Sequence, residues 1–270
     1  MSDRNLASYR IVDLTPGRRI WLNTLDLGGP AHAMYGLLEA DVTLARRLAS
    51  EQQLSFTGFL IHCLARAVAE NKDVQAYRKG KRRLVVFDDV DVGMMIEHQD
   101  GERRALMGHV IRGADARTVR AIHDEIRAVQ SAAAPAGRGM PAWFRRLMLL
   151  PWPLSWLVKV VLRWAVRRDP RITVSASGTV FVTSVGMFGG GHAGWGITSI
   201  PTSLSIVVGG IAWKPAVIAG RIEPREILSL TVAFDHDVID GAPATRFVRR
   251  FLELVESADG LAAASLAAAA

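Results

Sequence analysis

The amino-acid sequence predicts an α+β fold with a sizeable hydrophobic core. Strand-like apolar runs are mixed with amphipathic, helix-like stretches, and the two kinds do not alternate regularly as they do in parallel βαβ folds. The chain has 270 residues, of which 50% are hydrophobic, so it can form one large domain or two small ones. These observations favour a globular protein in which several strands and helices pack together.

The first half of the chain opens with an expected irregular arm, residues 1–33, in which Gly28-Gly29-Pro30 breaks any regular element. Two helices should follow the first strand, with Thr43 and Thr57 as their N-caps. The second of these helices is the more apolar and should be the more buried. The expected elements are strand 34–42, helix 43–54, helix 57–71, strands 83–87 and 90–97 joined by Asp88-Asp89, strand 105–111 and helix 115–130.

The second half starts with a linker rich in Ala, Pro and Gly at 132–139. Beyond residue 171, three apolar runs and one amphipathic stretch complete the domain. The alanine-rich tail, residues 258–270, is expected to be frayed or disordered, mainly after Gly260. The expected elements are strands near 179–184, 203–212 and 227–234, and a final helix at 242–256.

An unusual basic and aromatic segment occupies residues 138–171. It holds eight cations and one acid, so its net charge equals the +7 of the whole chain. Four of the seven tryptophans also lie here. They are Trp143, Trp152, Trp156 and Trp164. Because the cations lie beside tryptophans and are not spread over a groove-sized face, a nucleic-acid partner is not expected.

Residues 141–170 of this segment are rich in apolar side chains. Polar residues recur there every four positions, from Ser155 to Arg167, and would form one narrow stripe on a helix. Two prolines and two cations within 148–166 argue against a transmembrane span. Three interpretations stay open: a helical hairpin buried against the core or a neighbouring subunit, an anchor on an anionic membrane surface, and a lid for a hydrophobic acyl substrate.

Other reactive side chains give weaker signals. Cys63, the single cysteine, lies in an apolar helical stretch and is expected to be a buried small hydrophobe. His62 is expected to be a surface or hydrogen-bonded histidine, and His192 to belong to a flexible loop. No cluster of His, Cys and Asp has metal-ligand spacing, so no metal is expected. The first residues lack the apolar stretch of a secretory signal, which predicts a cytoplasmic location, peripheral to a membrane if 141–170 is an anchor.

The most informative segment is Asp235-His236-Asp237-Val238-Ile239-Asp240-Gly241. It lies between the apolar run 227–234 and the amphipathic stretch 242–256. A histidine at the end of a strand can take a proton near neutral pH, and an aspartate four residues later can order the loop around it. The alternative is a solvated turn in which the aspartate caps the next helix.

Five motifs, in family order, resemble the catalytic domain of the 2-oxo acid dehydrogenase acyltransferases, the E2 components, which share their fold with chloramphenicol acetyltransferase. Residues 228–242 resemble the signature around DHRxxDG, with Asp237 in place of the arginine. Residues 181–189 are similar to FTISNLGMFG, with one departure around Val182. The other three motifs are the segment 38–43, the strand 91–96 followed by Asp100-Gly101, and the turn 198–201 with the strand 204–211.

The resemblance implies a trimer of mixed sheets with flanking helices, in which 34–257 form the catalytic domain and 138–171 an insert. It implies that His236 is the general base and that Thr183 supplies the hydroxyl that stabilises the oxyanion, with Ser184 as the reserve candidate. Asp240 would hold the loop by pairing with an arginine near the start of the domain, Arg18 or Arg19. An aspartate at position 237 would favour the imidazolium form of His236 if it lay near the ring.

The resemblance also implies a reaction, acyl transfer between coenzyme A and a thiol such as a lipoyl group. The sequence has no Asp-Lys-Ala lipoylation motif, so the lipoyl group is expected on another chain or the acyl group on a free thioester. No residues that bind coenzyme A can be named. Homotrimers, or cages built from them, are the expected assemblies. The alternatives are a non-catalytic cage or membrane-associated scaffold that retains the fold, and transfer to a hydroxyl or amine acceptor.

Overall fold

The computed structural model describes residues 32–80, 82–100, 103–131, 146–147, 149–151, 153–185, 191–198 and 202–262. Most of the predicted N-terminal arm, the linker at 132–139 and the end of the tail lie outside these residues. So do the Gly-Met-Phe-Gly part of the second motif and the proline of the 198–201 turn.

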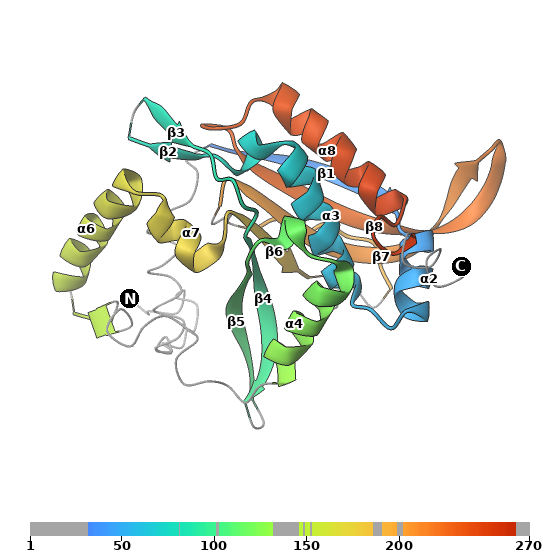
Figure 1. The fold of residues 1–270 in the computed structure, drawn as a ribbon, viewed down its shortest axis with the longest axis horizontal. Helices are drawn as coiled ribbons and strands as arrows, with labels where there is room; N and C mark the ends of the chain where they lie inside the picture. The colour runs from blue at the N-terminus through green and yellow to red at the C-terminus, as the bar shows by residue number, and fades with distance from the viewer. Residues whose placement is uncertain are drawn as a thin grey trace, which may run out of the picture.

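A mixed six-stranded sheet forms the centre of the fold (Figure 1), in the order β1-β8-β7-β6-β4-β5. Strands β4, β6 and β7 are parallel to one another, whereas β1, β8 and β5 each run antiparallel to a neighbour. The strands are β1 (Ala33–Asp41), β4 (Val92–Asp100), β5 (Arg103–Ile111), β6 (Val180–Ser184), β7 (Leu204–Ile218) and β8 (Arg221–Asp235). This sheet confirms the predicted α+β class.

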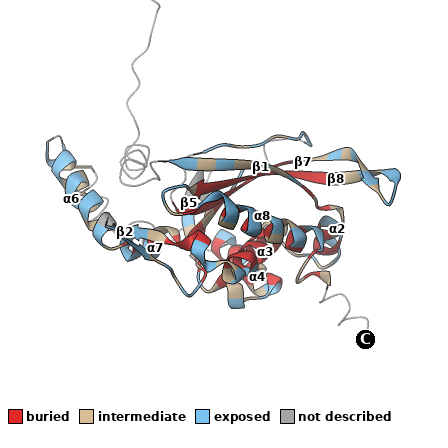
Figure 2. Cartoon of the chain, turned by 90° about the horizontal axis from the view of Figure 1, so that it is seen from above, coloured by how far each residue is buried: buried red, intermediate tan, exposed pale blue. Residues whose placement is uncertain are grey.

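Four helices cover one face of the sheet, as Figure 2 shows from above. They are α2 (Thr43–Glu51), α3 (Phe56–Glu70), α4 (Val119–Ser131) and α8 (Gly241–Glu256). Alternate side chains of β8, such as Leu228 and Leu230, are fully buried in the core under these helices. In α8, Phe247 and Phe251 stack with their ring centroids 6.0 Å apart. Among the residues that the structure describes, no helix packs on the opposite face of the sheet.

Both predicted helix caps are wrong. The N-cap of α3 is Ser55, whose Oγ accepts a hydrogen bond from the N–H of Gly58, so this helix begins before Thr57. Thr43 is the first residue of α2, and the N-cap position is Val42, which makes no side-chain cap. The hydroxyl of Thr43 instead donates to Asp41 over 2.6 Å. The carboxylate of Asp41 thus binds the Thr43 hydroxyl that the sequence suggests as the cap of this helix.

Two hairpins depart from the predicted strands. β2 (Tyr77–Lys79) and β3 (Arg83–Val85) form a separate two-stranded sheet, so the predicted strand 83–87 does not join the main sheet. β7 and β8 continue beyond the predicted limits of 212 and 227 as a long hairpin. Exposed Trp213 and Ile222 lie on this extension, which explains why no buried apolar run marked it.

The chain stays packed beyond the predicted domain limit at residue 257. Ala258 and Leu261 are fully buried in the core. The side-chain amide of Gln52 donates to the carbonyl of Leu261 over 3.0 Å. The domain therefore extends at least to Leu261. Burial of its apolar side chain stabilises the folded chain relative to one with a solvated tail.

The basic segment contains α6 (Leu154–Arg168), and α7 (Arg171–Ser177) follows at its end. In Figure 2, α6 extends away from the body of the domain. Its main contacts with other elements are to α7 and to β2. The helical hairpin buried against the core, one of the three interpretations, is thus not formed by the described residues of this single chain.

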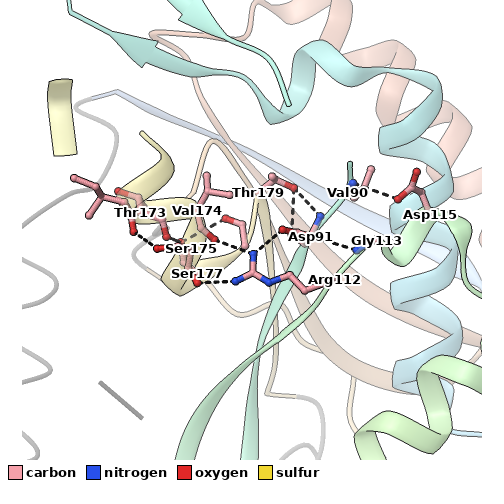
Figure 3. Close-up of polar contacts among 12 residues, drawn as sticks. Val90, Asp91, Arg112, Gly113, Asp115, Thr173, Val174, Ser175, Ser177 and Thr179 are labelled. Atoms are coloured by element: carbon pink, nitrogen blue, oxygen red, sulfur yellow. Dashed lines mark hydrogen bonds and ion pairs between the residues drawn. The ribbon is translucent and has the colours of Figure 1, made fainter. Parts of the chain in front are cut away.

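A polar network ties α7 to the sheet (Figure 3). Arg112, directly after β5, donates from Nη1 to the carboxylate of Asp91 over 2.6 Å. Its Nη2 donates to the carbonyl of Ser175 over 2.6 Å, at the C-terminal end of α7. A cation at this end of a helix also interacts favourably with the helix dipole. Arg112 therefore fixes the end of α7 against the start of β4.

Two glycines permit this close approach. A Cβ on Gly93 would lie 1.9 Å from the carbonyl oxygen of Ser177, which no real structure tolerates. Gly178 has a φ of +77° and lies against the backbone of Asp91. The end of α7 is thus seated directly on backbone, and any side chain at these two positions would displace it.

Candidate active site

The loop after β8 places His236 and Asp240 at one end of the sheet. β8 ends at Asp235, and α8 begins directly after Asp240, its N-cap. The N–H of His236 donates to the carbonyl of His32 over 2.8 Å, and the N–H of Ile239 donates to the carbonyl of Asp235 over 2.9 Å. The loop is therefore fixed through its backbone, whereas the side chains of His236 and Asp240 are exposed.

Asp237 faces two other partners. Its Oδ1 lies 2.8 Å from Nδ1 of His32, and its Oδ2 accepts a hydrogen bond of 2.8 Å from Nη1 of Arg78. The hydrogen bond to His32, followed by that to Arg78, holds the pKa of Asp237 below its ordinary value. Both carboxylate oxygens of Asp237 are thus engaged, one by His32 and one by Arg78. The neighbouring carboxyl of Asp235 is half-buried, and this desolvation raises its pKa.

Asp240 makes no side-chain cap to α8. Its carbonyl accepts the first hydrogen bond of that helix, from the N–H of Ala244. The arginines expected to pair with it, Arg18 and Arg19, lie outside the described residues. The loop-holding role of Asp240 therefore stays a prediction.

Thr183 and Ser184 project from opposite faces of β6. Val182 and Ser184 face the helices, because Val182 belongs to the core beneath them. Thr183 faces the uncovered side, in one row with Val207 of β7 and Thr231 of β8. Thr231 is fully buried there, and its hydroxyl has no hydrogen-bond partner within the described chain.

A short loop crosses part of this uncovered face. The carbonyl of Gly194 accepts a hydrogen bond of 2.9 Å from the N–H of Gly210, and the indole of Trp195 donates to the carbonyl of Leu38 over 2.9 Å. Apolar side chains around it stay exposed. They are Tyr35, Leu37, Val185, Trp195 and Ile197. Exposed apolar side chains thus surround this loop, whereas Val207 and Thr231, in the row of Thr183, are buried within the chain.

One chain does not bring His236 to either hydroxyl. Phe234 pairs with Leu204 at the start of β7, whereas Thr183 pairs with Val207 further along the same strand. With about 3.3 Å per residue along a strand and about 4.8 Å between strands, the backbones of His236 and Thr183 lie roughly 20 Å apart. General-base contact requires hydrogen-bond distance. His236 and Thr183 are therefore not brought together within one chain, so a site that uses both would need two chains.

A cleft of about 400 Å³ opens beside Ser184, on the side of the helices. Its walls include Arg46 of α2, Phe56 of α3 and Trp213 of β7. Nε of Arg46 lies 3.0 Å from Oε1 of Glu226, and its guanidinium lies 5.9 Å from the centroid of the Phe56 ring. No sequence motif marks these residues, because the tertiary fold alone brings the two helices and the strand together.

The remaining reactive side chains have structural roles. Cys63 is fully buried, and this desolvation raises the pKa of its thiol well above the usual range, so it is a poor nucleophile, as predicted. His62 is buried with Nδ1 2.9 Å from the carbonyl of Arg117, which confirms a hydrogen-bonded histidine. His192 is exposed on the loop that crosses the open face. Within the described ranges, no group of three or more His, Cys, Asp or Glu is placed to hold a metal ion.

Comparison with known families decides the classification. Residues 32–137 and 171–263 match the model of the 2-oxoacid dehydrogenases acyltransferase (catalytic domain). This chain belongs to that family. The two matched stretches leave out residues 138–170, so the basic segment separates them. The family assigned from the five motifs is thereby confirmed.

Among curated proteins, this acyltransferase domain is similar to the lipoamide acyltransferase component of the branched-chain alpha-keto acid dehydrogenase complex of Bacillus subtilis. The two are 24% identical over 209 residues, which are 76% of this chain and 40% of that protein. The chain thus spans less than half the length of the curated relatives it matches.

Solved structures confirm the fold. The cubic core of the pyruvate dehydrogenase multienzyme complex and the dihydrolipoamide acetyltransferase of Azotobacter vinelandii each give a TM-score of 0.65 at 19% identity, covering 97% of both chains. Chloramphenicol acetyltransferase gives a TM-score of 0.52 at 13% identity, covering 91% of this chain and 99% of that one. The acyltransferase domain therefore has the predicted chloramphenicol acetyltransferase-like mixed sheet with flanking helices.

Proposed function

We propose that this acyltransferase domain moves an acyl group between coenzyme A and a second thiol, such as a dihydrolipoyl group, with His236 as general base. One observation carries the proposal: His236 stands exposed at the end of β8, on a loop fixed by its backbone, four residues before the N-cap of α8. The Azotobacter vinelandii enzyme, investigated for the catalytic roles of a serine, a histidine and an asparagine, has the last two at this same spacing.

The chemistry needs a base and an oxyanion donor. A thiol is mostly protonated at neutral pH and attacks only as thiolate. The imidazole of His236 takes the proton of the attacking thiol, and the sulfur forms a bond to the thioester carbonyl carbon. The carbonyl oxygen becomes an oxyanion. When the intermediate collapses, the bond to the leaving sulfur breaks, and the imidazolium returns the proton to that sulfur.

Thr183 is the hydroxyl that we place at the oxyanion. It lies on the face of the sheet without helices, where a second subunit can deliver its His236 loop. Ser184 lies on the other face, beside the cleft formed with α2 and α3, and is the alternative. One preorganised hydroxyl donor contributes about 3 to 4 kcal/mol to the transition state.

A trimer is the assembly that this placement supports. A ring of three identical chains lets each face with Thr183 meet the His236 loop of its neighbour, so that three equal sites form. Because the fold is shared with the cubic core of the pyruvate dehydrogenase complex, a cage built from several trimers is the alternative, larger assembly. The lipoyl group in this proposal comes from a separate lipoyl-carrying protein.

The direct test follows the release of coenzyme A from short-chain acyl-CoAs in the presence of dihydrolipoamide. His236→Ala should reduce turnover about 100- to 10,000-fold, the usual contribution of a general base. His192→Ala, an exposed histidine on another loop, is the matched control and should stay active. Absence of turnover in the folded wild-type protein would contradict the proposal and favour a hydroxyl or amine acceptor, or a scaffold.

A further inference from the structure

One side of α6 is an exposed apolar face. Trp156, Val160 and Trp164 follow one another at intervals of four residues, and Leu157 and Val161 form the adjoining row. Each of these five side chains is between 45% and 61% exposed. They are called the α6 face below. A face of this kind on a globular protein marks a contact with a partner or a lipid surface.

The charge of the segment selects among partners. α6 contains four cations and no acid, and the surrounding residues 138–171 have a net charge of +7. The guanidinium of Arg168 lies 5.3 Å from the centroid of the Trp164 ring. Two copies of this face would repel each other, because each carries the same positive charge. An anionic surface would attract it.

The side chains themselves favour lipid. Trp rings prefer the headgroup level of a bilayer, where their apolar body and polar N–H are both satisfied. Long Arg and Lys side chains can extend from an apolar stem toward lipid phosphates. α6 has 15 residues and is about 22 Å long, which is shorter than the hydrocarbon core of about 30 Å. None of the helices that the structure describes is long and apolar enough to cross a membrane.

The fold holds this face away from the catalytic sheet. α6 extends from the body of the domain (Figure 2), and α7 connects it to β4 and β5 through Arg112 and Asp91 (Figure 3). The family match leaves out residues 138–170, so the α6 face lies outside the part of the chain that matches the family. α6 also contacts β2, whose Arg78 is hydrogen-bonded to Asp237, so the β2–β3 hairpin links α6 to the loop of His236.

We propose that the α6 face docks on the surface of an anionic lipid bilayer, with the helix lying in the plane of the headgroups. Vesicles of phosphatidylcholine with and without phosphatidylglycerol are the probes for the full-length chain. Wild-type protein should float with the anionic vesicles and not with the neutral ones, and added salt should weaken the binding. Trp156→Glu with Trp164→Glu should reduce binding at least about tenfold.

Trp213→Glu is the matched control, because Trp213 is 65% exposed but lies on the β7–β8 hairpin. It should bind vesicles like the wild type. Circular dichroism checks that each variant is folded. Independently of these variants, brominated lipid should quench the fluorescence of the wild-type protein, and Trp156→Phe with Trp164→Phe should remove most of that quenching.

Three results would overturn the proposal. They are wild-type protein that stays unbound to anionic vesicles, a double Glu variant that binds as well as the wild type, and brominated lipid that does not quench the wild type. If the wild type binds no vesicles and the double Glu variant changes the oligomeric state, the α6 face joins protein subunits instead. None of these results bears on the proposed acyl transfer, which is measured without lipid.

Discussion

Nη1 of Arg78 lies 2.8 Å from Oδ2 of Asp237, so the β2–β3 hairpin is tied to the loop that carries His236. The same carboxylate also meets His32, at the entrance to β1. Where the family signature has an arginine, this chain therefore has an acid whose partners come from two other elements. The loop that bears the proposed base is braced from the side of the hairpin.

Loss of this tie should affect turnover. Arg78→Ala is expected to lower kcat/KM about tenfold, because the loop of His236 gains freedom and its base is less well aligned. Arg83→Ala, on the partner strand of the same hairpin, is the control and should have little effect. Equal activity of the two variants in the coenzyme A release assay would show that the Arg78–Asp237 pair does not orient the site.

The Asp237 carboxylate should make stability depend on pH. Since its pKa in the folded state is lowered, its contribution is present above the ordinary Asp value of 3.8 and is lost as the pH falls through the folded pKa. Urea unfolding should therefore show wild type more stable than Asp237→Asn at neutral pH, with the difference shrinking below pH 3.8. Asp89→Asn, an exposed carboxylate, should give a smaller difference. A wild-type advantage that is unchanged in acid would refute this assignment.

The two hydroxyls on β6 can be told apart by activity. Thr183→Ala should lower kcat about 100- to 1,000-fold, the loss measured for one oxyanion donor. Thr183→Ser retains the hydroxyl and should recover most of the activity. Ser184→Ala should cost less than about tenfold, because its side chain faces the helices. The reverse order of the two alanine variants would move the oxyanion site to the cleft beside Ser184.

The seat of α7 predicts a stability effect. Gly93→Ala should destabilise the domain by about 1 to 3 kcal/mol, because its Cβ would meet the carbonyl of Ser177 and force α7 away from β4. Gly108→Ala is the matched control on β5, where a Cβ would meet nothing within 4 Å. Thermal and urea unfolding compare the two. A similar stability for both variants would show that α7 does not rest on Gly93.

Much of the fold could be predicted because burial leaves a pattern in sequence. The core strands near 203–212 and 227–234 are apolar runs, and the last helix has one apolar face, so their existence follows from periodicity. The extension of β7 and β8 could not be found this way. Its residues, such as Trp213 and Ile222, are exposed, and pairing with the neighbouring strand holds them in place instead of burial. β2 could not be found either, because it is short and charged and so leaves no buried apolar run in the sequence.

The site could be predicted only in part. The position of His236 at the end of a strand follows from the apolar run before it, and the structure places it there. The partners of Asp237 could not be predicted, because His32 and Arg78 are 205 and 159 residues away along the chain. The separation between His236 and Thr183 also depends on strand order, which no local pattern encodes. The candidate residues could be predicted from local sequence, whereas the distances between them depend on the order of the strands in the sheet.

The most direct test of the shared site is complementation between two inactive variants. His236→Ala and Thr183→Ala are co-expressed with different tags, and mixed trimers are purified through both tags. Each mixed trimer should hold one complete site out of three, about a third of the sites, with His236 from one subunit and Thr183 from its neighbour. Coenzyme A release should then reach about a third of the wild-type rate. Activity no higher than that of either variant alone would contradict a site built between subunits.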